Sequence, residues 1–131
     1  MGFTLLEILV VISIIGILIA IGSAAFSTAQ KKGRDARRRA DMKQYQSAYE
    51  QYYSVNSAYS ANCATMDINF SGGASAAPSD PKNSGSYVYT KTCTASTYCV
   101  CALLDNAGSG TYTDSGCTVG TGDYFCVQNL Q

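Results

Sequence analysis

The chain of 131 residues contains no histidine, only two prolines and few charged residues, which make up 14% of it. Without histidine, the protein lacks the side chain that most often serves as a general base and that commonly binds zinc. The acidic residues after residue 44 are scattered singly, so the sequence gathers no group of catalytic side chains. We therefore expect no enzymatic activity, no cofactor and no catalytic residues.

Charge is also absent from a long stretch near the N-terminus. Nineteen consecutive uncharged residues run from Ile8 to Phe26, and as a helix they would span roughly 29 Å, about the thickness of a bilayer's hydrocarbon core. A cleaved secretory signal is an alternative, but such signals begin with a basic region, and no basic residue precedes this run. An ordinary membrane anchor explains everything in the run except Glu7, the acid at its start.

The formal net charge is zero, but the charges are unevenly distributed. Seven of the nine positive residues lie between residues 31 and 43, a group that we call the basic collar: Lys31, Lys32, Arg34, Arg37, Arg38, Arg39 and Lys43. From residue 44 onward, two lysines face six acids. The collar favours contact with anionic lipid headgroups and with acidic side chains of other protein molecules. Binding to nucleic-acid phosphates is possible but not favoured.

All six cysteines follow the apolar run, and their even number favours disulfides formed in an oxidising compartment. A zinc site is the alternative, but the chain lacks both histidine and the paired C-x2-C spacing of common structural zinc sites. Fifteen pairings of six cysteines are possible. The pairing that we favour is Cys117–Cys126, Cys93–Cys99 and Cys63–Cys101.

One helix is predicted from about Thr4 to about Val55, because this stretch is free of proline and rich in helix-forming residues. A bend is expected at Gly22 and Ser23. A stripe for packing recurs at helical spacing, formed by Tyr45, Ala48, Tyr49, Tyr52 and Tyr59. Other faces of the helix are assigned to Arg38, Lys43, Gln46 and Glu50.

The remainder predicts loops and three strands. Ser71–Ser86 is a loop, Ser86–Cys93 and Tyr98–Leu104 form a hairpin, and the stretch DYFCVQNLQ is a last strand pairing antiparallel with it. A loop of about 18 residues precedes this last strand. The expected fold class is therefore α+β, a long N-terminal helix packed on a small antiparallel sheet and stabilised by disulfides. No metal site is assigned, although Asp105, Asp114 and Asp123 are weak calcium candidates.

The start of the chain, Gly2-Phe3-Thr4-Leu5-Leu6-Glu7 followed by about twenty apolar residues, resembles the class III signal of type IV pilins. The resemblance implies that a prepilin peptidase cleaves after Gly2 and methylates the new N-terminus at Phe3. Glu7 falls on the family's glutamate. We expect its carboxylate to neutralise the α-amino group of Phe3 in a neighbouring subunit, which would set the stagger between subunits during assembly.

The same resemblance implies three parts: a leader remnant at residues 1–2, a transmembrane and filament-core half of the helix at 3–30, and an extracellular head at 31–131. The implied function is that of a structural subunit of a type IV pilus, for adhesion, motility or surface attachment. The alternatives are a pseudopilin or minor pilin of a type II secretion or DNA-uptake fibre, and a membrane-anchored binding domain that does not polymerise. Bound calcium would favour the secretion fibre.

Partners and location follow from this resemblance too. The subunit is expected to assemble with copies of itself into a helical homopolymer, with the help of an assembly platform and its ATPase. Its precursor is expected in the inner (cytoplasmic) membrane and the finished filament outside the cell, on the cell surface.

Overall fold

A single helix, α1, occupies Leu5–Asn56 of the computed structural model, which describes residues 2–70 and 72–131. The helix therefore has nearly the predicted bounds, and it passes Gly22 without interruption. The bend expected at Gly22 and Ser23 stays a prediction.

The end of α1 has a clear local cause. Ser57 adopts a left-handed conformation with φ of 56°, and its N–H donates to the carbonyl of Tyr53 at 2.7 Å. A residue in this conformation closes the last turn and directs the chain away from the helix axis.

The chain divides into two compact units, Met1–Gly33 and Arg34–Gln131. The boundary between residues 30 and 31 that the family resemblance implies stays a prediction. Met1, half of the expected leader remnant, lies outside the described residues. In the first unit, the described residues beyond the N-terminal segment form the apolar half of α1, while the second unit contains the polar half of α1 and all the strands.

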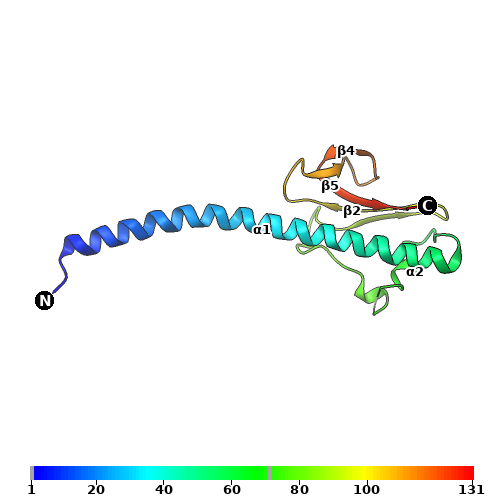
Figure 1. The fold of residues 1–131 in the computed structure, drawn as a ribbon, viewed down its shortest axis with the longest axis horizontal. Coiled ribbons are helices and arrows are strands. Elements are labelled where there is room, and N and C mark those ends of the chain that lie inside the picture. The colour runs from blue at the N-terminus through cyan, green and yellow to red at the C-terminus, as the bar shows by residue number, and fades with distance from the viewer. Residues whose placement is uncertain (1, 71) are drawn as a thin grey trace. The chain divides into compact units, whose positions relative to one another are not determined.

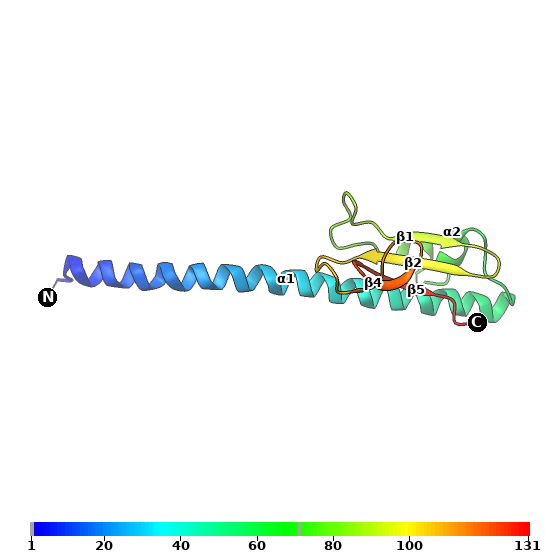
Figure 2. The same ribbon diagram turned by 90° about the horizontal axis from the view of Figure 1, so that it is seen from above.

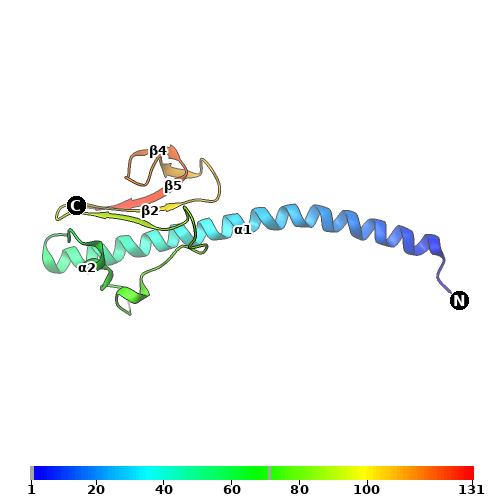
Figure 3. The same cartoon turned by 180° about the vertical axis from the view of Figure 1, so that it is seen from behind.

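Five strands form one antiparallel sheet in the second unit, in the order β1-β2-β5-β3-β4 (Figure 1). Their bounds are β1 Thr90–Cys93, β2 Tyr98–Leu103, β3 Gly110–Tyr112, β4 Val119–Gly122 and β5 Tyr124–Gln128. The hairpin β1–β2 and its pairing with β5 confirm the predicted three-stranded arrangement. Figure 3 shows β4 on the side of β2 and β5 that is remote from α1.

The hairpin β3–β4 was not expected, because the sequence predicts a loop of about 18 residues there. Its strands consist largely of glycine and threonine, which carry little β-strand signal. A Cβ on Gly110 would collide with the backbone of Tyr124, and one on Gly122 with the backbone of Tyr112. Glycine therefore allows these strands to pack closely. The same residue is uncommon in strands, so it weakens the prediction of a strand from the sequence.

The first strand begins later than predicted. Residues 84–87 form a tight turn in which the N–H of Tyr87 donates to the carbonyl of Ser84 at 3.1 Å, with Gly85 at a positive φ of 59°. Between α1 and β1 lie a short helix, α2 (Cys63–Asp67), and a turn of 3-10 helix, η1 (Ala74–Ala76). The side chain of Asn62 caps α2 by accepting from the N–H of Ala64. Figure 2 shows α2 beside β1.

The main core lies between α1, β2 and the segment around α2. Its buried residues are Met42, Tyr45, Ala48, Tyr49, Tyr59, Met66, Phe70, Tyr98, Val100, Ala102 and Val127. Tyr45, Ala48 and Tyr49 thus confirm part of the predicted stripe, while Tyr52 is half-buried. Tyr59 is also buried, but it follows the end of α1 and so does not belong to a stripe of the helix. The assignment of Arg38 to another face is wrong, because its side chain is fully buried.

The three predicted disulfide pairings are wrong, and strand register explains why. The bonds are Cys63–Cys93, Cys99–Cys117 and Cys101–Cys126. Residues directly opposite each other across two strands lie on the same face of a sheet, and neighbours along a strand lie on opposite faces. Cys93 is opposite Tyr98, so it lies on the face toward α1, whereas Cys99 lies on the other face.

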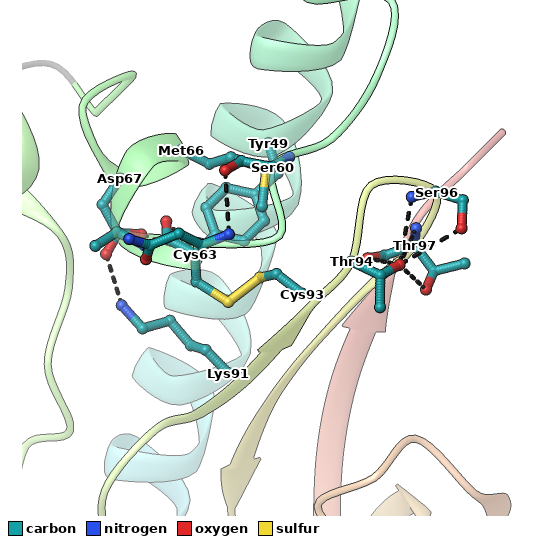
Figure 4. Close-up of a disulfide and its surroundings, with 12 residues drawn as sticks. Tyr49, Ser60, Cys63, Met66, Asp67, Lys91, Cys93, Thr94, Ser96 and Thr97 are labelled. Atoms are coloured by element: carbon teal, nitrogen blue, oxygen red, sulfur yellow. Dashed lines mark hydrogen bonds and ion pairs between the residues drawn. A yellow bond between two sulfur atoms is a disulfide. The ribbon is translucent and has the colours of Figure 1, made fainter.

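The positions of two of the three bonds can be traced to the elements that carry them. Cys101 is directly opposite Cys126, at a Cα–Cα distance of 4.1 Å. Cys63 opens α2, where it reaches Cys93 at the end of β1 (Figure 4). Beside this bond, the ammonium group of Lys91 lies 2.6 Å from the carboxylate of Asp67. The disulfide and the ion pair together attach α2 to β1.

Candidate functional site

The N-terminal end of α1 places Glu7 in a defined position. The N–H of Glu7 donates to the hydroxyl oxygen of Thr4 at 3.2 Å, so Thr4 caps the helix and Glu7 is its third residue. A carboxylate in the first turn also interacts favourably with the positive end of the helix dipole. Sequence reasoning did not single out Thr4, although the pattern T-x-x-E before an apolar run is a known signal for a helix start.

Gly2 and Phe3 precede the first turn and are both exposed, with 81% of Phe3 accessible. A Cβ placed on Gly2 would meet no atom within 4 Å. The peptide bond between these residues therefore lies outside the helix with open space beside it. A protease needs such a segment, because it must bind its substrate in a non-helical conformation.

The large apolar side chains that the structure describes in the first unit are not covered by other residues. The large apolar residues from Phe3 to Phe26 are all exposed, and Leu5 reaches 91%. The helix is long and apolar enough to cross a membrane, judged by length and composition alone. A helix that is apolar on all sides is stable only where lipid or protein surrounds it.

The polar side chains within this stretch make hydrogen bonds inside the helix. The hydroxyl of Ser13 donates to the carbonyl of Leu9 at 2.8 Å, and that of Ser23 to the carbonyl of Ala20 at 3.0 Å. Such bonds satisfy a hydroxyl group without a partner from another molecule. The Glu7 carboxylate is exposed, and no ion pair joins it to another described residue.

Three of the seven cations of the basic collar bind groups of the second unit. Arg34 and Arg38 bind carboxylates, while Arg39 donates to the carbonyl of Ser109 at 2.7 Å and lies over the ring of Phe125. The exposed cations of the collar are Lys31, Lys32, Arg37 and Lys43. The surface charge available to phosphates or headgroups is therefore that of four cations and not of all seven.

Arg38 is the buried centre of a group of ions that reaches the surface at Lys82. We call it the Arg38 cluster, formed by Arg34, Arg38, Lys82, Asp35, Asp80 and Asp105. Its guanidinium lies 2.6 Å from the carboxylate of Asp80, 2.8 Å from that of Asp35 and 3.1 Å from that of Asp105. Three cations therefore balance three carboxylates, and the cluster joins α1 to two distant loops.

The ion pairs decide the protonation of this cluster. Burial by itself would lower the pKa of Arg38, but hydrogen bonds to Asp80, Asp105 and Asp35 outweigh it and raise the pKa. For Asp105, burial opposes the shift, and hydrogen bonds from Lys82, Arg34 and Arg38 hold the pKa well below its usual range. Arg38 and the carboxylates around it are thus charged at neutral pH.

Most buried tyrosine hydroxyls donate to carboxylates. Tyr49 donates to Asp67 at 2.8 Å, and Tyr59 and Tyr98 donate to Glu50 at 3.0 and 2.9 Å. Tyr45 instead donates to the carbonyl of Pro78, and burial raises the pKa of its hydroxyl to about 12. Two acids of the second unit, Asp67 and Glu50, therefore accept hydrogen bonds from tyrosines of the core.

The three calcium candidates are not brought together. Asp105 belongs to the Arg38 cluster, Asp114 accepts from the N–H groups of Gly116 and Thr118, and Asp123 accepts from the N–H of Gly108. Asp105 thus joins its loop to α1, Asp114 stabilises its own loop, and Asp123 binds the loop between β2 and β3. These residues were weak calcium candidates because they lie in a glycine-rich region, and each carboxylate has protein partners of its own.

Comparison with known families identifies the first segment. Residues 2–23 match the family model of the prokaryotic N-terminal methylation motif. This motif marks the class III signal of type IV pilin-like proteins, and the long helix that begins at Leu5 fits it. The curated proteins include no match to the chain.

Proposed function

Because residues 2–23 carry the class III signal of type IV pilin-like proteins, we propose that this protein is a structural subunit of a type IV pilus. Such a pilus is an extracellular helical filament for adhesion, motility or surface attachment. The observation that carries the proposal is the uncovered apolar surface from Phe3 to Phe26. Lipid would cover this surface before assembly, and the helices of other subunits would cover it afterwards.

Processing supplies the first step of this function. A prepilin peptidase would cleave after Gly2, at an exposed peptide bond outside α1, and would methylate the amino group of Phe3. The freed amine carries a positive charge, which is costly to bury without a partner. The platform and the ATPase would then move the subunit from the inner membrane into the filament.

Glu7 supplies the partner for this amine. Its carboxylate is exposed at the first turn of α1, and no ion pair joins it to another described residue. A neighbouring subunit that presents its Phe3 amine to this carboxylate neutralises both charges in apolar surroundings. Only one axial stagger brings the two groups together, so the pair also sets the spacing of subunits.

The test is electron microscopy of material sheared from the surface of cells that express the chain, combined with mass spectrometry of its N-terminus. We expect filaments whose subunit begins at N-methylated Phe3. Short fibres retained in the periplasm would instead support the pseudopilin or minor pilin alternative. A processed chain that stays in the membrane without forming any fibre would contradict the proposal and favour an anchored binding domain.

A further inference from the structure

Four of the six cysteines lie together on the face of the sheet that is remote from α1. Cys99 and Cys101 alternate along β2 and point to this face, and Cys126 lies opposite Cys101 on β5. Cys117 comes from the connection between β3 and β4. The four Sγ atoms all lie within 4.8 Å of one another.

Two of the Sγ–Sγ distances between the two disulfides are close to those of a metal site. The Sγ atom of Cys101 lies 3.5 Å from that of Cys99 and 3.9 Å from that of Cys117, although neither pair is bonded. In a tetrahedral zinc site with Zn–S bonds of about 2.3 Å, two sulfur atoms are about 3.8 Å apart. Only the two bonded pairs, Cys99–Cys117 and Cys101–Cys126, would have to separate.

We propose that the reduced form of this cluster is a four-cysteine site for a thiophilic divalent ion, with zinc as the expected occupant. The sulfur atoms of Cys99, Cys101, Cys117 and Cys126 are the ligands. Cys63 and Cys93 are excluded, because they lie with α2 and the opposite face of β1.

The surroundings support a preformed site. Cys101 is fully buried and Cys126 nearly so, and Tyr112 and Tyr124 pack against the cluster. Three of the four ligands belong to paired strands, so hydrogen bonds of the sheet hold them in place whether or not the sulfur atoms are bonded. Ligands on rigid elements lose little conformational freedom when a metal binds.

The redox step that opens the site needs a reductant, for which we name a phosphine. Each disulfide accepts two electrons and two protons and becomes two thiols, while the phosphine is oxidised to its oxide with an oxygen atom from water. The metal ion then displaces protons from the four thiols to solvent, since thiolates are the ligands. The bound ion would hold the β3–β4 hairpin to the sheet in place of two disulfides, before these form or after they are reduced.

The test uses the full chain in detergent, reduced with a phosphine under anaerobic conditions and titrated with Co²⁺ as a spectroscopic probe. We expect one equivalent of Co²⁺ to give the absorption of a tetrahedral thiolate site and to be displaced by Zn²⁺. Alkylation of the zinc-loaded chain should then label only Cys63 and Cys93, as mass spectrometry can read without any variant. Labelling of all six cysteines, or the absence of the tetrahedral spectrum, would overturn the proposal.

Two variants provide matched controls. The double variant Cys63→Ser/Cys93→Ser removes the other disulfide and should keep the full Co²⁺ spectrum. The double variant Cys99→Ser/Cys117→Ser removes two ligands and should lose it. An unchanged spectrum in the second variant, or loss in a first variant that circular dichroism shows to be folded, would contradict the assignment of ligands.

Discussion

The two units of the chain differ in whether they bury their apolar side chains and whether their charged side chains form ion pairs. Residues 2–33 expose their large apolar side chains and carry one acid, Glu7, without an ion pair to any described residue. Residues 34–131 bury an arginine and several aspartates, each with a partner. The difference indicates where each unit finds its stability, because the second unit completes its own core while the first needs lipid or other molecules around it.

The largest effect is expected from the unpaired acid of the first unit. Glu7→Ala should leave the second unit folded and the helix inserted in the membrane, but should abolish or disorder filaments, because the neighbouring Phe3 amine would lose its counter-charge. Electron microscopy of sheared material measures this loss, and Glu7→Asp is the matched control that keeps the carboxylate. Normal filaments from Glu7→Ala would show that the acid of the first unit does not need a partner from another subunit.

The Arg38 cluster should respond most strongly in the second unit. Arg38→Met leaves three buried carboxylates without their central cation, and we expect the free energy of unfolding to fall by about 3–5 kcal/mol. Arg37→Met, at an exposed side chain on the same helix, should change it by less than about 0.5 kcal/mol. Denaturant titration of both variants measures the difference, and equal effects would refute the role given to burial.

The disulfide between α2 and β1 should contribute somewhat less. The double variant Cys63→Ser/Cys93→Ser opens a connection between cysteines that are 30 residues apart, and we expect a loss of about 2–4 kcal/mol in stability. The ion pair between Lys91 and Asp67 remains to hold α2. Thermal unfolding followed by circular dichroism should show a lower Tm with an unchanged helical signal from α1.

The smallest effect is expected from a change of pH, because near neutral pH such a change does not alter the charges of the three aspartates in the cluster. Although burial opposes it, hydrogen bonds lower the pKa of Asp35, Asp80 and Asp105 below the ordinary aspartate value of about 4. As pH falls, these aspartates therefore take up protons in the unfolded chain before they do so in the folded one. The stability that the three carboxylates contribute is complete above pH 4 and is lost as pH falls through the lowered pKa values. Unfolding measured from pH 6 to pH 2 should show this loss, with a shallower slope in Arg38→Met.

Much of the molecule was predictable because its signals are local. The apolar run, the proline-free helix and the methylation signal each depend on neighbouring residues, and α1 was predicted within one residue at each end. The hairpin β1–β2 and the last strand also have strong strand formers. The signal T-x-x-E was likewise present in the sequence, so Thr4 could have been identified as the cap.

Other features depend on contacts between distant residues. Arg38 belongs to a charged run, and nothing beside it in the sequence indicates that Asp80 and Asp105 surround its guanidinium. The β3–β4 hairpin was missed because its glycines allow the backbone of a neighbouring strand to come close. The need for glycine depends on where that neighbouring strand lies, and the local sequence does not indicate this. Likewise, the place of Asp105, Asp114 and Asp123 in one glycine-rich region does not indicate which partner each carboxylate has.

The sequence by itself determined the helix and its uncharged first half, because helix propensity and hydrophobicity belong to single residues and short stretches. Only the tertiary structure decided which cysteines bond and which cations remain at the surface. Strand register places Cys101 opposite Cys126 and Cys93 on the opposite face from Cys99, and the fold buries Arg38 among carboxylates. These outcomes depend on which residues the fold brings within a few ångströms of one another. Composition and spacing along the sequence do not indicate which residues these are.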